Sequence, residues 1–353
     1  GIILVLCGDT PLLRAETLRD FVNYHNQNQV SATILTAFLK IPTGYGRIIR
    51  NSQGIVERIV EEKDATADER KICEINSGVY CFDKANVFRA LRQIKSKNKQ
   101  KEFYLTDAIE ILKNNGESIA AYPVPDELET LGINSRLELA EAEKIMREKI
   151  NAKWMKKGVT LVDPASTFIG GDVKIGPDTI IYPCCFIEGK TSIGKSCLIG
   201  PSVRLIDATL GNRVEIQFAV ARKSLIEDEA QIGPFCSLRP ETVIKKGAKV
   251  GTFVEIKKTV IEEKSKVPHL SYIGDATIGK NVNVGAGTIT CNYDGIRKHQ
   301  TVIKDDAFIG SDTMLVAPVK IGKGAVTGAG STITQDVPPG GLGLERAEQK
   351  NIK

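Results

Sequence analysis

The chain has 353 residues and a net charge of +5, and 42% of its residues are hydrophobic. Because one hydrophobic core rarely grows beyond roughly 250–300 residues, this length predicts two domains. The small charge and the lack of long Lys/Arg runs exclude a typical nucleic-acid-binding protein. Eight cysteines without paired or metal-type spacing, no signal peptide and no apolar run of roughly 18 residues favour a cytoplasmic protein with no membrane partner.

Residues 1–133 are predicted to form an α/β domain. The apolar run 1–7 has no initiating Met and is typical of a buried parallel strand. Such a strand needs neighbours on both sides, so we expect the chain to lack an N-terminal portion. Helix and strand patterns then alternate. The predicted elements are a helix over about 16–28 and strands over 30–39, 46–50, 54–61 and 78–82.

Asp9 comes directly after the first predicted strand. Ligands of α/β sheets bind beyond the carboxyl ends of the strands. A carboxylate at that place suits Mg²⁺, which prefers oxygen ligands and phosphate partners. An Asp that only forms the turn in the sequence GDTP is the alternative, and the spacing alone does not separate the two.

A linker helix is predicted over residues 134–157. Its start carries a capping box, in which the Ser135 hydroxyl would accept from the Glu138 amide while the Glu138 carboxylate reaches back. Apolar residues near helical spacing follow, and Gly158 ends the segment.

In residues 158–353 an aliphatic side chain returns every six residues. A period of six fits neither a helix nor plain strand alternation. It is typical of a parallel β-helix, in which each short strand contributes one inward aliphatic side chain before the chain turns a corner. A β-sandwich, the alternative, would not keep a fixed phase. The positions in phase are Ile169, Ile175, Ile181, Ile187, Ile193, Ile199, Leu205, Ile226, Ile232, Leu238, Ile244, Val250, Ile256, Ile303, Ile309, Leu315 and Ile321.

The repeat is interrupted over residues 288–301. Insertions in a solenoid are loops on one face, often the binding face. We therefore expect functional polar residues near this interruption.

Ten short motifs match one bacterial enzyme family in order. They are GDTPL (8–12), GYGRI (44–48), IVEEKD (59–64), EIN (74–76), FYLTD (103–107), GIN (132–134), LRP (238–240), FVEIKK (253–258), HLSYIGD (269–275) and NVGAGTITCNYDG (283–295). The chain resembles the bifunctional N-acetylglucosamine-1-phosphate uridyltransferase / glucosamine-1-phosphate N-acetyltransferase family, from residue 1 to about residue 346.

This resemblance implies α/β plus all-β architecture: a truncated Rossmann-like nucleotidyltransferase domain, a linker helix and a left-handed parallel β-helix of hexapeptide repeats. It also implies synthesis of UDP-N-acetylglucosamine for peptidoglycan and lipopolysaccharide, and a homotrimer with acetyltransfer sites between subunits.

The β-helix of this family transfers acetyl from acetyl-CoA to glucosamine-1-phosphate, a reaction that needs a base for the attacking amine. His269 is the candidate because a neutral imidazole near pH 7 accepts a proton, and a purely structural His is the alternative. Glu255 is a weaker candidate for orienting the base or the amine. The resemblance places Arg239, Lys257, Tyr272, Asn283 and Lys298 on the sugar phosphate. It places Ala286, Asn292, Tyr293, Ser311, Ala329 and Arg346 on acetyl-CoA.

The first domain of this family transfers uridylyl from UTP to N-acetylglucosamine-1-phosphate. The resemblance places Mg²⁺ on Asp9 and Asn134. It places the sugar nucleotide on Gly46, Glu61, Asn76 and Asn134. The family's Gly-rich UTP loop lies in a segment absent from this sequence, so we expect negligible uridyl transfer by this chain, although its natural parent would possess it.

Two other functions compete with this interpretation. A metal enzyme like γ-class carbonic anhydrase needs three His on neighbouring coils, and only His269 and His299 lie in the repeat region. A non-catalytic hexapeptide-repeat scaffold or regulator with a nucleotidyltransferase-like domain is the second. It would have no reason to collect Arg239, Lys257, His269 and Lys298 around a loop insertion.

Overall fold

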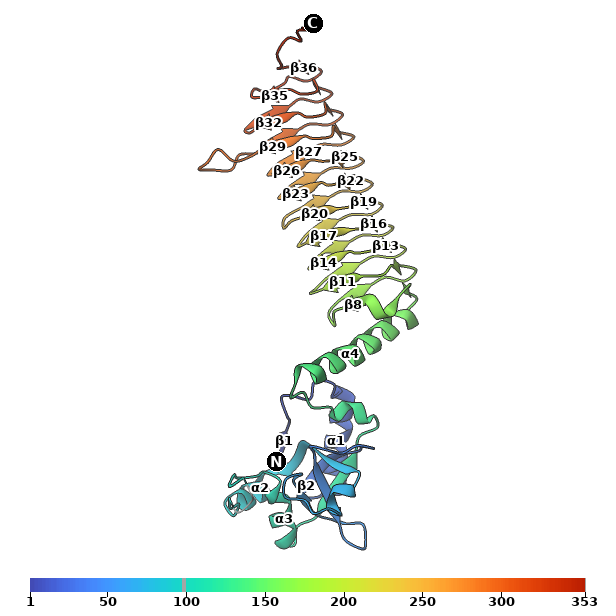
Figure 1. Cartoon of the computed structure of the whole chain (residues 1–353), viewed down its shortest axis with the longest axis vertical. Coiled ribbons are helices and arrows are strands. Elements are labelled where there is room, and N and C mark those ends of the chain that lie inside the picture. The colour runs from blue at the N-terminus through green and yellow to red at the C-terminus, as the bar shows by residue number, and fades with distance from the viewer. Residues whose placement is uncertain (97–99, 353) are drawn as a thin grey trace. The chain divides into compact units, whose positions relative to one another are not determined.

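A computed structural model describes residues 1–96 and 100–352. It divides into two compact units, Gly1–Met146 and Arg147–Lys353 (Figure 1). The predicted boundaries at 133/134 and 157/158 stay predictions.

The first unit is built on a mixed sheet with strand order β4–β3–β5–β2–β6, and β1 also pairs with β5. β2 and β6 run parallel, whereas the other pairs are antiparallel. Val87 and Ala90 of α2 and Ile109 and Leu112 of α3 pack into one core with strand residues such as Phe82. The elements are β1 (Ile2–Val5), α1 (Ala15–Asn28), β2 (Ala32–Phe38), β3 (Gly46–Arg50), β4 (Val56–Val60), η1 (Glu69–Lys71), β5 (Glu74–Asp83), α2 (Lys84–Leu91), α3 (Asp107–Asn114), β6 (Ile119–Pro123) and η2 (Glu127–Thr130).

The predicted α/β class and the five predicted elements after residue 15 are confirmed, while α2, α3 and β6 were not predicted. The prediction of a buried parallel strand at the start is wrong. β1 runs antiparallel to β5, and its side chains alternate between exposed and half-buried. A run of aliphatic residues carries no information about strand direction, because either direction can bury the same side chains.

Helix α4 spans Arg136–Lys156, and its start has the predicted capping box. The Ser135 hydroxyl accepts from the Glu138 amide at 3.2 Å, and the Glu138 carboxylate accepts from the Asn134 amide at 2.7 Å. Both bonds satisfy donors that a helix start leaves unpaired. At the other end of α4, Trp154 packs into the core of the second unit.

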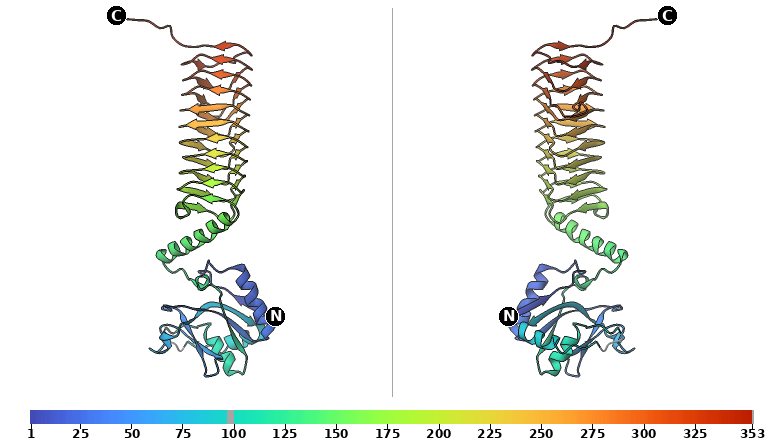
Figure 2. Two further views of the ribbon diagram at one scale, coloured as in Figure 1. Left: turned by 90° about the vertical axis from the view of Figure 1, so that its right-hand side faces the viewer. Right: turned by 90° about the vertical axis from the view of Figure 1, so that its left-hand side faces the viewer.

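The second unit is a parallel β-helix whose described strands form three sheets of 11, 10 and 9 strands. Figure 2 shows these strands stacked as successive coils. The first sheet holds β7 (Thr160–Leu161), β10 (Ile180–Ile181), β13 (Leu198–Ile199), β16 (Glu215–Ile216), β19 (Gln231–Ile232), β22 (Lys249–Thr252), β25 (Lys266–His269), β28 (Asn283–Val284), β31 (Phe308–Ile309), β34 (Val326–Thr327) and β36 (Leu342–Gly343).

The second sheet carries Lys257 and Tyr272, two of the five residues predicted to bind the sugar phosphate. Its strands are β8 (Thr167–Ile169), β11 (Cys185–Glu188), β14 (Arg204–Ile206), β17 (Ala219–Arg222), β20 (Cys236–Leu238), β23 (Glu255–Lys257), β26 (Tyr272–Gly274), β29 (Ile289–Cys291), β32 (Met314–Val316) and β35 (Thr332–Ile333). The third sheet holds β9 (Lys174–Ile175), β12 (Ser192–Ile193), β15 (Thr209–Leu210), β18 (Leu225–Ile226), β21 (Val243–Ile244), β24 (Val260–Ile261), β27 (Ala276–Ile278), β30 (Thr301–Ile303) and β33 (Val319–Ile321). A short helix, η3 (Pro164–Ser166), precedes β8.

The six-residue phase predicted the core of this unit. All seventeen aliphatic positions in phase are buried in one continuous cluster. Gly194 explains why an inward Ile is often followed by Gly. A β-carbon at Gly194 would lie 2.3 Å from the carbonyl oxygen of Gly211 on the next coil, so a larger residue cannot be placed there without moving a coil.

The interruption of the repeat is shorter than predicted. Residues 289–291 form β29 and residues 301–303 form β30, so the loop that leaves the stack beside β29 comprises residues 292–300 (Figure 1). Ile289 faces outward and Thr290 inward, which keeps the strand alternation although the aliphatic phase is lost.

Candidate functional site

The second sheet of the β-helix aligns outward polar side chains from successive coils. Glu255 on β23 lies beside Tyr272 on β26, and Lys257 lies beside Gly274. Arg239 follows β20, and its amide donates to the Ile256 carbonyl at 2.8 Å, so it stacks one coil before Lys257. The Arg239 Nη1 and Glu255 Oε1 atoms form an ion pair at 2.9 Å.

Three cations gather at this place. Lys298, from the loop, approaches Lys257 closely enough to lower the pKa of the Lys257 ammonium. Loss of hydration and the charge of Arg239 lower that pKa further, and Asp275 opposes the shift. An anion bound between these cations would remove their mutual repulsion, which is how a phosphate site differs from an ordinary solvated surface.

Gly274 leaves room for two polar groups beside the cations. A β-carbon built there would lie 2.5 Å from the Tyr272 hydroxyl and 2.7 Å from Asn292 Nδ2. Asn292 is buried, and its Nδ2 donates to Asp275 Oδ2 at 2.6 Å. The structure therefore brings together Arg239, Lys257, Tyr272, Asn292 and Lys298.

Gly274→Ala should displace the Tyr272 hydroxyl and the Asn292 amide without unfolding the coils, because both displaced atoms end side chains. We expect KM for the sugar substrate to rise about tenfold, the effect of roughly one lost hydrogen bond to a charged group. Gly247→Ala, on a nearby coil, is the comparison variant. Its added β-carbon meets only the flexible Lys264 side chain. The positive φ of Gly247 adds backbone strain, so this variant shows what a glycine substitution does away from the cluster. Equal KM values for Gly274→Ala and the wild type would contradict the expectation.

His269 and Asn283 lie at opposite ends of two neighbouring strands of the first sheet, β25 and β28. His269 ends β25, is exposed and stands in register with Thr252. Asn283 begins β28 next to Lys266. Within the parts of the chain that are described, no hydrogen bond or ion pair links either side chain to the cation cluster. Glu255 is paired with Arg239 rather than with the imidazole.

Four of the six residues predicted to bind acetyl-CoA form a column along successive coils. The Asp312 amide donates to the Ala286 carbonyl at 2.6 Å, and the Gly330 amide donates to the Ser311 carbonyl at 2.8 Å. Arg346 Nη1 donates to the Ala329 carbonyl at 3.2 Å. The other two lie elsewhere: Asn292 joins the cation cluster, and Tyr293 lies in the exposed loop.

The first unit brings its predicted residues together in two groups. Gly46 lies against Glu61 and Asn76, since a β-carbon there would be 3.4 Å from the Glu61 carboxylate and 3.5 Å from the Asn76 β-carbon. Sequence reasoning missed two partners: Thr106, whose hydroxyl donates to Glu61 at 3.0 Å, and Tyr80, which accepts from Asn76 Nδ2 at 2.7 Å. Burial raises the pKa of Glu61, and the Thr106 bond opposes it.

Asp9 and Asn134 converge at Gly132. A β-carbon at Gly132 would lie 3.8 Å from Asp9 Oδ2 and 3.7 Å from Asn134 Nδ2, and the Ile133 amide donates to the Asp9 carbonyl at 2.9 Å. Among the described residues no group of three or more His, Cys, Asp or Glu side chains could hold a metal. Two protein ligands fit Mg²⁺, which usually keeps several waters and binds substrate phosphates.

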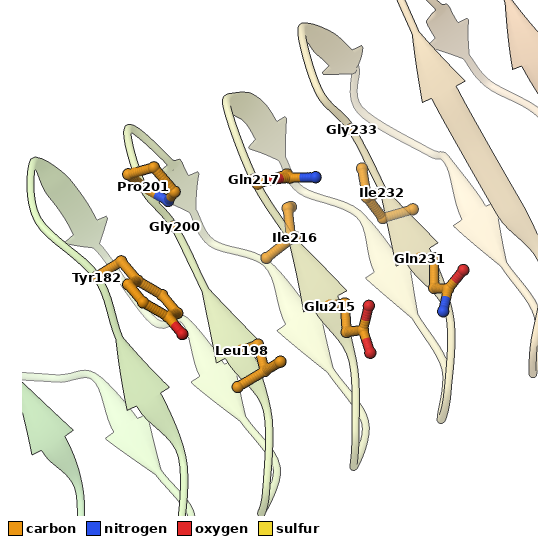
Figure 3. A pocket seen from close by; sticks show the side chains of 10 residues that line it. All are labelled: Tyr182, Leu198, Gly200, Pro201, Glu215, Ile216, Gln217, Gln231, Ile232 and Gly233. Atoms are coloured by element: carbon orange, nitrogen blue, oxygen red, sulfur yellow. The ribbon is translucent and has the colours of Figure 1, made fainter.

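A groove of about 340 Å³ opens on the first sheet, several coils before the cation cluster. Figure 3 shows Glu215, Gln217 and Gln231 along it, with Tyr182 on the coil at one end. None of the predicted site residues lines this groove. The candidate site is therefore identified by its clustered charged side chains and their alignment on successive coils, not by a deep pocket.

Comparisons with protein families also divide the chain into two parts, as the structure does. The nucleotidyl transferase family matches residues 1–155, the bacterial transferase hexapeptide family matches residues 300–335, and the GMPPB C-terminal domain family matches residues 220–294. The bifunctional protein GlmU of Syntrophomonas wolfei is 54% identical over 350 residues, which are 99% of this chain and 78% of that protein. The chain belongs to the GlmU family. The GlmU protein of Halalkalibacterium halodurans is 50% identical over 351 residues, 99% of this chain and 77% of that protein.

GlmU family membership confirms the fold predicted from sequence and makes the chain a two-domain transferase. The first unit is a nucleotidyltransferase domain, and the second is a left-handed β-helix of hexapeptide repeats. None of the helices within residues 1–96 and 100–352 combines the length and apolar character that crossing a membrane requires.

Proposed function

We propose that the β-helix transfers the acetyl group of acetyl-CoA to the amine of glucosamine-1-phosphate, giving N-acetylglucosamine-1-phosphate and free CoA. The cluster of Arg239, Lys257 and Lys298 carries this proposal, because its like charges favour a phosphate between them. A non-catalytic scaffold has no use for such a cluster.

In this proposal the amine attacks the thioester carbonyl, and the His269 imidazole accepts a proton from the amine as the C–N bond forms. Collapse of the tetrahedral intermediate then breaks the C–S bond and releases the CoA thiolate, which takes up a proton. The planar guanidinium of Arg239 can donate two parallel hydrogen bonds to the phosphate, whereas the ammonium groups of Lys257 and Lys298 act as point charges. Asn283 would complete the sugar site.

The acetyl-CoA arm would lie along the column of Ala286, Ser311 and Ala329, where small side chains allow close approach to the coils. Arg346 is exposed and would supply a cation for a CoA phosphate. Tyr293 and Asn292 would contact the cosubstrate from the loop.

A homotrimer would bring these groups into one cleft between subunits. An exposed apolar ridge beside His269 supports this part of the proposal: Phe218, Phe235, Phe253 and Leu270 occupy one corner on successive coils. The three rings have centroid separations of 5.2 and 5.3 Å, and Phe253 and Leu270 are 59% and 60% exposed. Apolar patches of this kind mark protein contacts. The eight free cysteines suit a reducing cytoplasm.

Thiol release from acetyl-CoA in the presence of glucosamine-1-phosphate tests the proposed reaction. Lys257→Met should raise KM for glucosamine-1-phosphate about tenfold or more, because one charge-assisted hydrogen bond to the phosphate is lost. KM for acetyl-CoA should stay within twofold of the wild-type value. Lys245→Met is the control, since the Lys245 ammonium pairs with Glu227 and lies outside the cluster. Equal KM values for the two variants would contradict the proposal.

For the first unit we propose uridyl transfer from UTP to N-acetylglucosamine-1-phosphate as the reaction its site serves. Gly46, Glu61, Asn76 and Asn134 would line the sugar nucleotide. Asp9 and Asn134 would hold Mg²⁺, which neutralises phosphate charge.

Asp9→Asn should weaken Mg²⁺-dependent binding of UDP-N-acetylglucosamine about tenfold or more, because a neutral amide is a poorer ligand for a hard cation. Calorimetry with and without Mg²⁺ measures this. Binding that is equally strong in the variant, or that ignores Mg²⁺ in the wild type, would contradict the assignment.

A further inference from the structure

The loop that delivers Lys298 is a polar hairpin with no core of its own. Tyr293 and Lys298 form an antiparallel bridge, and the His299 amide donates to the Asn292 carbonyl at 2.8 Å. Ile296 at the tip is 85% exposed and Tyr293 is 60% exposed. Hydrogen bonds rather than apolar packing must therefore hold the hairpin.

Asp294 is the centre of those hydrogen bonds. Its Oδ1 atom accepts from the Ile296 and Arg297 amides at 2.7 and 2.6 Å. Its Oδ2 atom lies 2.6 Å from His299 Nε2. The Arg297 amide first, and then His299, hold the pKa of the Asp294 carboxyl well below its usual range.

His299 connects this turn to the cation cluster. It lines a cleft of about 250 Å³ together with Lys258, Asp275, Lys298 and Gln300. Lys298 precedes it directly, and its ammonium is held close to that of Lys257 although the two charges repel. Asp275 lines the same cleft and offsets part of this repulsion, while the hairpin sets where the Lys298 side chain begins.

We propose that Asp294 and His299 form a positioning pair that fixes the hairpin and thereby holds the Lys298 ammonium at the phosphate site. This role rests on the proposed sugar-phosphate site. Neither residue touches the substrate. The pair acts by reducing the ordering that binding would otherwise require of Lys298.

A double-variant cycle tests this role through the Kd of the whole chain for glucosamine-1-phosphate, measured by calorimetry. Lys298→Met should weaken binding about tenfold, and His299→Gln should weaken it about three- to tenfold, the range of one to two hydrogen bonds. Since His299 acts through Lys298, the double variant should match Lys298→Met within twofold. Ile296→Ala, at the hairpin tip, is the control and should bind like the wild type.

Asp294→Asn gives a readout that a merely structural role would not move. The Asn side chain keeps an oxygen for the two amides but offers an N–H to His299, so only a neutral imidazole can pair with it. The ratio of variant to wild-type Kd should therefore be larger in acid, where an imidazole carries a second proton, than above neutral pH, and titration of the ligand phosphate cancels in this ratio. Lys258, Asp275 and Lys298 face His299 in the cleft and are the same in both proteins.

Fully multiplicative effects in the double variant, or wild-type affinity in His299→Gln, would overturn the positioning role. Absence of thiol release with the binding cycle intact would instead remove the proposed reaction and leave the pair assigned. Absence of glucosamine-1-phosphate binding by the wild type would overturn both.

Discussion

Replacing His269 by Ala is expected to slow acetyl transfer by about 10²–10⁴-fold, the usual contribution of a general base. His269 is the last residue of β25, and its exposed imidazole makes no contact with the hydrophobic core. Because the side chain is exposed, the variant should unfold at the same temperature as the wild type. Its Kd for acetyl-CoA should also stay within twofold, since the predicted cosubstrate column lies on other coils.

Thiol release at saturating substrates measures the loss, and added imidazole should restore part of the rate by replacing the missing base. His269→Gln keeps the polarity of the side chain without the basic nitrogen and should be as slow as His269→Ala. Turnover within twofold of the wild type in either variant would remove His269 as the base.

Replacing Ile256 by Ala is expected to lower the free energy of unfolding by about 2–5 kcal/mol, the range for a buried Ile or Leu truncated to Ala. Ile256 is fully buried and stacks between Leu238 and Ile273 on neighbouring coils. Its strand also carries Glu255 and Lys257 outward. Each coil is stabilised by its neighbours, so a cavity at Ile256 should also destabilise the adjacent coils that carry the site residues.

The urea midpoint of the second unit checks this expectation. Lys249→Ala on the adjacent sheet removes an exposed side chain and should stay within about 0.5 kcal/mol of the wild type. If Ile256→Ala and Lys249→Ala had equal urea midpoints, the inward aliphatic side chains would not be what stabilises the β-helix.

The β-helix core could be predicted in detail because one inward side chain per six residues is a local rule that each strand repeats. Every position in phase, from Ile169 to Ile321, is buried. The direction of β1 could not be predicted, since the pairing of Ile3 with Phe82 depends on a strand far along the chain.

Polar partners of the candidate site were harder to predict than its motif residues. Asp275 meets Asn292, which is 17 residues later in the sequence, because the coils stack them. Asp294 and His299 meet through the fold of an insertion that the repeat does not describe. No spacing rule reveals such contacts, although the return of charged residues right after the NVGAGTITCNY segment marks where the chain leaves the repeat.

The fate of the acetyl group tests the assigned chemistry most directly. The whole chain is incubated with acetyl-CoA labelled on the acetyl group and with glucosamine-1-phosphate, and the products are identified by mass spectrometry. We expect the label on the nitrogen of the sugar phosphate, with one free thiol formed for each labelled product. Intact acetyl-CoA, or labelled acetate without labelled sugar phosphate, would contradict the account.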